Sequence, residues 1–279
     1  MHIIMSFNSL FLMPSLVTIY TLFMYNEGVI LHIFYIDLKD DERRCVERLL
    51  KMKTSHSIVW HLVEEDLTDK IHYDTGRFSM YTLYRFLAYR ILDNSIKRCL
   101  WLDSDLMIRG SVRELYDTIM EEGQYFTGAL EVSQDMIRRF GELRECTNAG
   151  VLLMDLEKLR SDDMMDRYWE YLFDSEIEHV LPDQDALNHV FKGKIKFVDQ
   201  EVWNRFPITV FDEEVPMEVI QMKADKARII HFLSGNKVWL EEYAPIWEAR
   251  AEKIPFVKIM YEEYLGYLDE CVRFLETHV

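Results

Sequence analysis

Short apolar runs alternate with amphipathic stretches along the first part of the chain. Residues 3–5, 29–37 and 58–63 are apolar runs of strand length, and such runs predict buried strands. Residues 40–53, which begin with acidic side chains, and residues 78–92 carry apolar positions at helical spacing and predict helices. This alternation is typical of a mostly parallel central sheet covered by helices. We therefore expect an α/β fold with ligands bound at the carboxyl ends of the strands.

The apolar stretch from Phe11 to Met24 admits two interpretations. It is short for a membrane span, contains Pro14 and has no Lys or Arg before it, so it predicts a buried helix, with a membrane-directed segment as the alternative. Residues 241–279 again have helical spacing, and their acidic side chains outnumber the basic ones, unlike a basic membrane-binding helix. We expect one main domain over residues 1–240, a C-terminal helical appendage over residues 241–279, and no integral membrane span.

The composition limits the class of partner. The chain has 279 residues, 49% of them hydrophobic, which is enough for one large core. Its formal net charge of -17 lacks the basic surface that phosphate backbones require, so we expect no nucleic-acid partner. A bound metal ion would reverse the sign locally for an anionic small molecule. The four cysteines have no paired spacing, which indicates a reducing, cytoplasmic setting; they are Cys45, Cys99, Cys146 and Cys271.

The most informative segment is an apolar run that ends in two carboxylates, Asp103 and Asp105. Many surface turns hold two acids, but here apolar residues 100–102 precede the acids and residues 106–108 follow them, which is poor composition for a solvated turn. Carboxylates at the end of a buried strand are costly unless something neutralises them. A hard divalent cation bound through oxygen does so, and the segment therefore predicts a metal site that handles an anion.

Two further segments place amides and acids next to apolar runs. Asn148 and Gly150 precede an apolar strand, where a structural turn and an amide that binds sugar hydroxyls are equally good explanations. Pro182 and Asp183 begin a helical segment, so Asp183 is either a helix cap or a site residue. A cap explains the next residue, Gln184, less well.

A third segment is a short strand that ends in His231 and is followed by Gly235 and Lys237. A histidine beside apolar residues is often a core residue. A glycine-containing turn and a lysine instead suit a diphosphate whose metal also binds the imidazole. Two carboxylates and one imidazole favour Mn²⁺, with Mg²⁺ as the alternative.

Together and in this order, these segments resemble the family 8 glycosyltransferases, which are retaining enzymes with a Rossmann-like, type A fold that use nucleotide sugars. The resemblance runs from the N-terminus to about Trp247. It rests on Trp-Leu-Asp-Ser-Asp, Asn-Ala-Gly-Val-Leu-Leu-Met-Asp-Leu, Leu-Pro-Asp-Gln-Asp-Ala-Leu-Asn, the pair Trp203-Asn204, and residues 231–239.

The resemblance implies a role for individual residues and makes residues 1–240 a nucleotide-sugar-binding catalytic domain. The implied metal ligands are Asp103, Asp105 and His231. The implied sugar-binding and catalytic residues are Asn148, Asp183 and Gln184. The implied donor-binding residues are Asn8, Arg85, Ser104, Glu131, Gly235 and Lys237. Leu10 and Phe11 stand where the family often has Asn and Tyr, so a ring for base stacking is kept, while Ser234 and Val238 alter the phosphate loop.

The implied reaction moves a hexose from a UDP-sugar to a hydroxyl of a carbohydrate or glycoconjugate acceptor. Metal and Lys237 would stabilise the diphosphate leaving group. The amide of Gln184 is a weak nucleophile compared with a carboxylate, which favours a front-face reaction over a double displacement. The alternatives are a metal-dependent nucleotidyltransferase or phosphohydrolase, and an inactive nucleotide-sugar-binding module.

Overall fold

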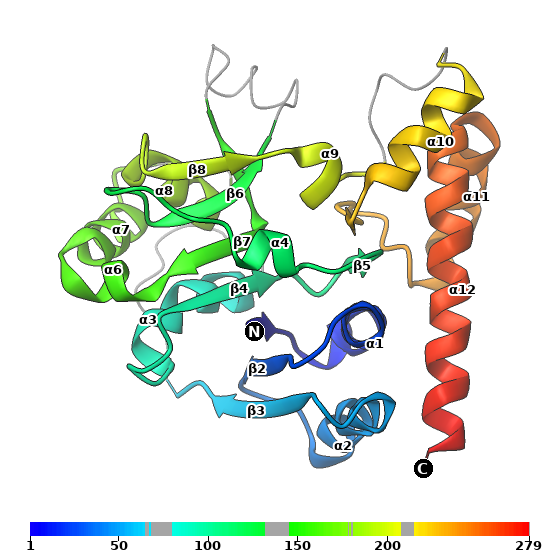
Figure 1. Ribbon diagram of the computed structural model, residues 1–279, viewed down its shortest axis with the longest axis horizontal. Coiled ribbons are helices and arrows are strands. Elements are labelled where there is room, and N and C mark those ends of the chain that lie inside the picture. Colours follow the sequence, from blue (N-terminus) through cyan, green and yellow to red (C-terminus); the bar gives the residue numbers. More distant parts are fainter. Residues whose placement is uncertain are drawn as a thin grey trace.

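A seven-stranded mixed sheet forms the centre of the protein. The computed structural model describes residues 1–64, 67, 80–131, 145–177, 179, 181–207 and 215–278. The strand order is β3-β2-β1-β4-β7-β6-β8, and a separate pair joins β5 to β9 (Figure 1). The bounds are β1 His2–Ser6, β2 Ile30–Tyr35, β3 Ser57–Leu62, β4 Arg98–Leu102, β5 Leu106–Ile108, β6 Phe126–Leu130, β7 Thr147–Asp155, β8 Ile195–Val198 and β9 Ile229–His231.

Most strand pairings are parallel, as the alternating pattern predicts. β1 pairs in parallel with β2 and β4, β2 with β3, and β6 with β8. Within the seven-stranded sheet β7 is the exception, because it runs antiparallel to both β4 and β6, and the separate pair of β5 and β9 is also antiparallel. Residues 147–150 belong to β7 itself, so the interpretation of this segment as a turn is wrong.

Helices cover both faces of the sheet. The α-helices are α1 Leu12–Tyr25, α2 Asp40–Arg48, α3 Ala88–Ile91, α4 Arg113–Tyr116, α6 Leu156–Ser161, α7 Met164–Phe173, α8 Pro182–Val190, α9 Gln200–Trp203, α10 Met217–Lys226, α11 Ala244–Lys253 and α12 Pro255–Thr277. The 3₁₀ helices are η1 Ser9–Phe11, η2 Leu49–Met52, η4 Met80–Leu87 and η5 Glu241–Tyr243. β4 contributes to the core on both faces, with Trp101 on one and Leu102 on the other.

Two expected helices differ in their internal geometry. The segment 40–53 is α-helical only to Arg48 and continues as η2. The segment 78–92 is mainly the 3₁₀ helix η4 followed by the short α3, and its positions 78 and 79 lie outside the described residues. Residues 83–88 are all buried, so hydrophobic spacing alone does not distinguish a helix of 3.6 residues per turn from one of 3.0.

The apolar stretch 11–24 forms the buried helix that its composition predicts. Residues 14–23 of α1 are buried, and Thr18 donates hydrogen bonds to the carbonyls of Ser104 and Leu106. α1 therefore supports the segment that carries the two acids. Within the described ranges, no helix has the length and apolar run needed to cross a bilayer.

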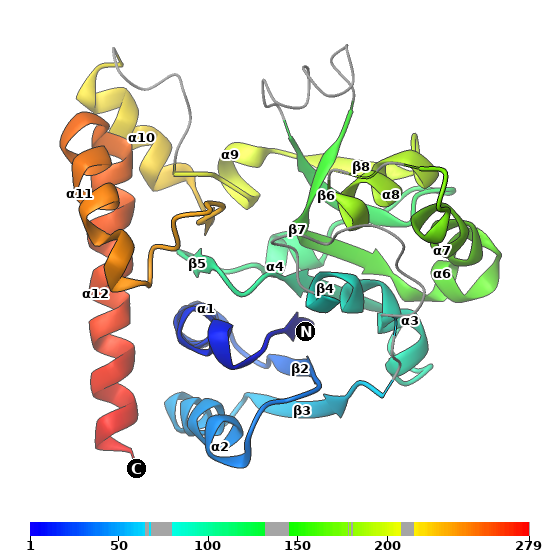
Figure 2. The same cartoon turned by 180° about the vertical axis from the view of Figure 1, so that it is seen from behind.

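The C-terminal helices α10, α11 and α12 lie side by side at one end of the molecule, away from α6, α7 and α8 (Figures 1 and 2). Arg109, directly after β5, pairs with Glu263 of α12 at 2.8 Å. The indole Nε1 of Trp247 in α11 donates to the carbonyl of Asn236 at 2.9 Å. These contacts attach α11 and α12 to β5 and to the loop after β9.

Three histidines on neighbouring strands form a hydrogen-bonded row. Nδ1 of His2 lies 3.0 Å from Nε2 of His32, and Nδ1 of His32 lies 2.9 Å from Nε2 of His61. Burial lowers the pKa of His32 to about 3, with further lowering by His61 and His2. His32, at the centre of the row, is therefore neutral over the physiological pH range.

Candidate active site

The two acids follow β4, at the carboxyl end of a central strand. The backbone N–H of Asp103 donates to the carbonyl of Gly150 at 2.8 Å, and the indole Nε1 of Trp101 donates to Oδ1 of Asp103 at 2.7 Å. Between the acids, Oγ of Ser104 donates to the carbonyl of Ser6 at 3.1 Å. The hydroxyl that the resemblance assigns to donor binding thus ties the acidic segment to the end of β1.

His231 reaches the acids because β9 pairs with β5. In the register of this pair, His231 lies opposite Leu106, which directly follows Asp105. Nε2 of His231 is 3.1 Å from Oδ1 of Asp105 and 3.8 Å from Oδ2 of Asp103. One ligand atom from each of the three residues lies within 4.8 Å of the others, which brings the predicted metal ligands together.

The space between these ligands depends on Gly150. A Cβ at this position would lie 2.7 Å from Oδ2 of Asp103 and closer still to Cε1 of His231. The φ angle of Gly150 is not positive, so the backbone does not require a glycine there. The absent side chain instead leaves room beside two carboxylates and an imidazole, a set of donors that suits Mn²⁺ or a similar divalent ion. The residues present therefore fit a metal ion.

Two cations lie against the acids. Nη2 of Arg85 is 3.2 Å from Oδ1 of Asp103, and Nζ of Lys237 is 3.4 Å from Oδ2 of Asp105. Burial by itself raises the pKa of Asp105, but His231 and Lys237 outweigh it and hold that pKa below its ordinary value. Asp105 is therefore ionised near neutral pH, as an oxygen ligand must be.

Arg85 is buried, and its guanidinium group contacts two backbone carbonyls and two carboxylates of the protein. Its Nε donates to the carbonyl of Thr82 at 2.7 Å, and Nη1 donates to the carbonyl of Ala149. Nη2 lies between the carboxylates of Asp103 and Asp183, at 3.2 Å and 3.4 Å. Arg85 thus links the metal side of the site to the residues predicted to bind sugar.

Asp183 is not the cap of α8. The N-cap is Leu181, and its backbone N–H donates a hydrogen bond to Oδ2 of Asp185 at 2.9 Å. This interaction explains the acid at position 185. The carboxylate of Asp183 instead faces Arg85. Burial raises the pKa of Asp183, Arg85 opposes the rise and Asp103 adds to it.

The predicted sugar-binding amides form one connected network. Nδ2 of Asn148 donates to Oε1 of Gln184 at 3.1 Å, and Nε2 of Gln184 donates to Oε2 of Glu131 at 3.0 Å. Asn148 and Gln184 are buried. Three residues, from β7, α8 and the position directly after β6, therefore meet next to the candidate metal ligands.

The remaining predicted donor residues lie around Lys237. Phe11 and Trp239 meet edge to face at 5.4 Å, and Nζ of Lys237 lies 5.3 Å and 5.1 Å from the two ring centres. The side chain of Asn8 accepts from the backbone N–H of Phe11 at 3.2 Å and so caps η1. Gly235 is exposed in the loop after β9.

A family model decides the relationship of this chain to known proteins. The model of Glycosyl transferase family 8 matches residues 2–243. The chain belongs to glycosyltransferase family 8. This membership confirms the resemblance predicted from the motifs.

Family 8 relatives are distant in sequence but similar in fold. A lipopolysaccharide 1,3-galactosyltransferase of Salmonella typhimurium is 24% identical over 75% of this chain and 63% of its own length. The glycosyltransferase GlyF of Streptococcus pneumoniae is 23% identical over 85% of this chain and 56% of its own length. The chain thus spans about six tenths of the length of these curated relatives. The crystal structure of the galactosyltransferase LgtC with donor and acceptor sugar analogs has a TM-score of 0.72 at 17% identity and covers 97% of this chain and 96% of its own, which shows the shared glycosyltransferase type A fold.

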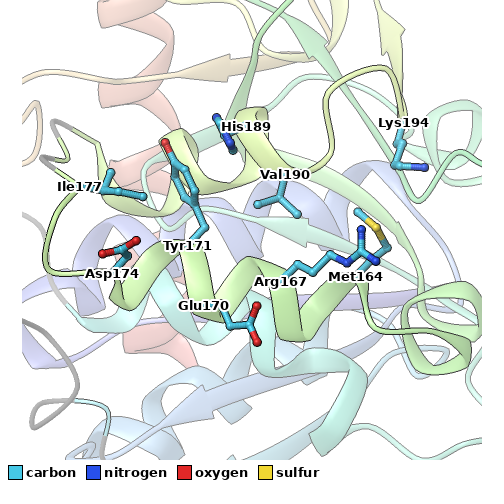
Figure 3. A pocket seen from close by; sticks show the side chains of 9 residues that line it. All are labelled: Met164, Arg167, Glu170, Tyr171, Asp174, Ile177, His189, Val190 and Lys194. Atoms are coloured by element: carbon cyan, nitrogen blue, oxygen red, sulfur yellow. The ribbon is translucent and has the colours of Figure 1, made fainter.

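A surface pocket elsewhere on this family 8 protein contains none of the predicted site residues. It lies between α7 and α8 and is lined by Tyr171 and Arg167 of α7 and by His189 of α8, among others (Figure 3). The rings of Tyr171 and His189 stack 4.1 Å apart at 15°. The predicted site is therefore the cluster at the ends of β4, β7 and β9.

Two site residues were given no role by sequence reasoning. Gly150 was read as part of a turn, and its importance depends on contacts with His231 that no local pattern reveals. Asn204 appears in the motif Trp203-Asn204, and the structure places it, fully buried, against Nδ1 of His231. The signal in the sequence was the amide in the motif Trp203-Asn204.

Proposed function

We propose that this protein is a retaining, metal-dependent glycosyltransferase that moves a hexose from a UDP-sugar to a hydroxyl of a carbohydrate or glycoconjugate acceptor. The observation that carries the proposal is that the three candidate metal ligands, here called the metal triad (Asp103, Asp105 and His231), are connected through Asn204 to the buried amides of Asn148 and Gln184. Family membership supports the reaction class. The names of the relatives, which include lipopolysaccharide galactosyl- and glucosyltransferases, support a hexose and a glycoconjugate acceptor.

Asp103, Asp105 and His231 would hold the metal ion, Mn²⁺ by preference for a mixed oxygen and nitrogen set and Mg²⁺ as the alternative. When bound, the ion supplies positive charge that stabilises a diphosphate leaving group. Lys237 contacts the other carboxylate oxygen of Asp105, Oδ2. Its ammonium group would interact more strongly with the leaving group as the leaving group becomes more negative.

Phe11 and Trp239 provide the surface for the nucleobase. Their rings flank Lys237, so a base stacked on Phe11 would place its diphosphate near the ammonium group. Leu10 is 79% exposed beside Phe11 and offers no side-chain hydrogen bond to a base. Recognition of uracil then depends on stacking and on backbone groups more than on this side chain.

The hydrogen bonds of Gln184 favour a front-face reaction. Its amide oxygen already accepts from Asn148, and its amide nitrogen donates to Glu131, which holds the group in place without making it a better nucleophile. The neighbouring carboxylate of Asp183 is paired with Arg85. In this arrangement the leaving phosphate accepts the proton of the acceptor hydroxyl, and Gln184 positions the sugar.

Donor hydrolysis with and without Mn²⁺ across a panel of nucleotide sugars tests this proposal. We expect metal-dependent release of UDP and free hexose, and Asp103→Ala should abolish it while circular dichroism stays unchanged. Asp163→Ala, which removes an exposed carboxylate at the N-cap of α7, is the matched control. Cleavage of nucleotides that carry no hexose on their phosphate would indicate a phosphohydrolase or nucleotidyltransferase. Donor binding without turnover would indicate a binding module.

A further inference from the structure

Asn204 lies next to the metal triad because the backbone at residues 204 and 205 runs alongside β9. The N–H of Arg205 donates to the carbonyl of Ile229 at 3.0 Å, and the N–H of His231 donates to the carbonyl of Arg205 at 2.8 Å. These backbone bonds align the amide of Asn204 with the imidazole of His231. Oδ1 of Asn204 is 2.9 Å from Nδ1 of His231, and both side chains have no exposed surface.

The orientation of the side-chain amides of Asn148 and Asn204 follows from the backbone N–H of Gly150, which can act only as a donor. The backbone N–H of Gly150 can only donate, and it lies 2.9 Å from Asn148, so the atom of Asn148 that faces it is the amide oxygen. The same oxygen lies 3.1 Å from the side-chain amide of Asn204. That contact is a hydrogen bond only if Asn204 presents its NH₂ group to it.

The orientation of Asn204 in turn decides the tautomer of His231. With its NH₂ group directed at Asn148, Asn204 presents its oxygen to Nδ1 of His231. A carbonyl oxygen only accepts, so Nδ1 must carry the proton. Nε2 is the atom that faces Asp103 and Asp105, 3.1 Å from Oδ1 of Asp105. A metal ion bound there would replace any proton on Nε2 and take its lone pair, while Nδ1 keeps its proton.

We propose that Asn204 is a positioning residue that holds His231 in the Nδ1–H tautomer, with the Nε2 lone pair directed at the metal ion. This inference rests on the metal site of the proposed function. Partners that bond the second nitrogen of a metal-binding histidine fix its tautomer and ring orientation, and their loss typically lowers metal affinity by about 10- to 100-fold. The network also joins His231, through Asn204 and Asn148, to Gln184, so the metal and sugar sides share one set of fixed amides.

Two substitutions separate the acceptor function from the link to Asn148. Asn204→Leu has similar size and removes both hydrogen bonds. Asn204→Asp keeps an acceptor for Nδ1 of His231 and loses only the donor to Asn148, which Gly150 still holds. We expect Asn204→Leu to weaken Mn²⁺ binding, measured by electron paramagnetic resonance, by about 10- to 100-fold, and Asn204→Asp, which keeps the acceptor for His231, to lose less affinity than Asn204→Leu.

A double-mutant cycle tests whether Asn204 acts through the histidine. In a His231→Gln background, the ligand that Asn204 orients is absent, so adding Asn204→Leu should change Mn²⁺ affinity by less than about 2-fold. An equal loss in both backgrounds would show that Asn204 supports the site by another route and would overturn the proposal.

The tautomer itself is measurable in the metal-free protein. Long-range ¹H–¹⁵N correlation spectra of ¹⁵N-histidine-labelled protein should show a proton on Nδ1 of His231 in the wild type and in Asn204→Asp. His231→Gln assigns the signal. A wild-type His231 without a proton on Nδ1, or an unchanged pattern of ring protonation in Asn204→Leu, contradicts the proposal. If the wild type binds no Mn²⁺, the metal-dependent function fails, and these spectra still support or overturn the role of Asn204.

Discussion

Gly150→Ala should remove metal binding while leaving most of the fold in place. The substitution adds a single methyl group to β7, at a position whose φ angle an alanine can adopt. That methyl group would point into the space between His231 and Asp103. The change therefore tests the size of the metal site and leaves every proposed ligand present.

The size of the expected loss of Mn²⁺ affinity follows from how close the added methyl group would lie to its neighbours. Its carbon would lie 2.7 Å from Oδ2 of Asp103, whereas ordinary contact begins at 3.4 Å, so the carboxylate must retreat by about 0.7 Å and His231 by more. Ligand distances in metal sites are held to about 0.2 Å, so the affinity for Mn²⁺ should fall by at least about 100-fold. Overpacking a core typically costs about 1–3 kcal/mol, equivalent to a fall in Tm of about 2–5 °C for a chain of this size.

Mn²⁺ titration and thermal unfolding of the same preparations measure both effects. Gly266→Ala is the control for the substitution itself, because a Cβ there meets nothing within 4 Å and alanine is favoured over glycine within a helix. Gly128→Ala is the control for a clash outside the triad, since its Cβ would collide with Thr147. It should lower Tm and retain Mn²⁺ binding. Wild-type Mn²⁺ affinity in Gly150→Ala would refute the assignment of this space to a metal ion.

Three further changes test other parts of the site and of the sheet. Lys237→Ala should lower kcat/KM for the donor by about 10- to 100-fold, because the ammonium group that faces Asp105 meets both the bound diphosphate and the leaving group; Lys237→Arg should recover part of the loss, and wild-type kinetics in the alanine variant would make Lys237 an ordinary surface residue. Gln184→Ala should lower kcat by about 100-fold, the scale of one lost polar contact in the transition state, whereas a hexose adduct on Gln184→Glu, formed at the rate of turnover and detected by mass spectrometry, would contradict the front-face mechanism. The depressed pKa of His32, about 3, means that the unfolded chain takes up a proton near pH 6.5 and the folded chain does not. This contribution to stability is present above about pH 6.5 and is lost as the pH falls towards 3, so chemical unfolding between about pH 7 and 4 should show a smaller loss of stability for His32→Leu than for the wild type.

The sequence by itself determined the class of fold and the chemical groups of the site. Alternating apolar runs and amphipathic stretches give a mostly parallel α/β sheet because each pattern can bury its apolar side in only a few ways. The acids at 103 and 105, the amides at 148 and 184, and His231 stand out because polar side chains next to buried strands need partners. Local composition is enough to locate such residues.

Only the tertiary structure decided how these groups are brought together and which other residues position them. β7 reverses direction between β4 and β6, and the pairing of β5 with β9 brings His231 to Asp105 across a long separation in sequence. Helical spacing did not reveal that η4 is a 3₁₀ helix, because its consecutive residues 83–87 are all buried. Gly150 and Asn204 acquire their roles from contacts with residues distant in the chain, and such contacts depend on the packed geometry of strands and not on the pattern of neighbours along the sequence.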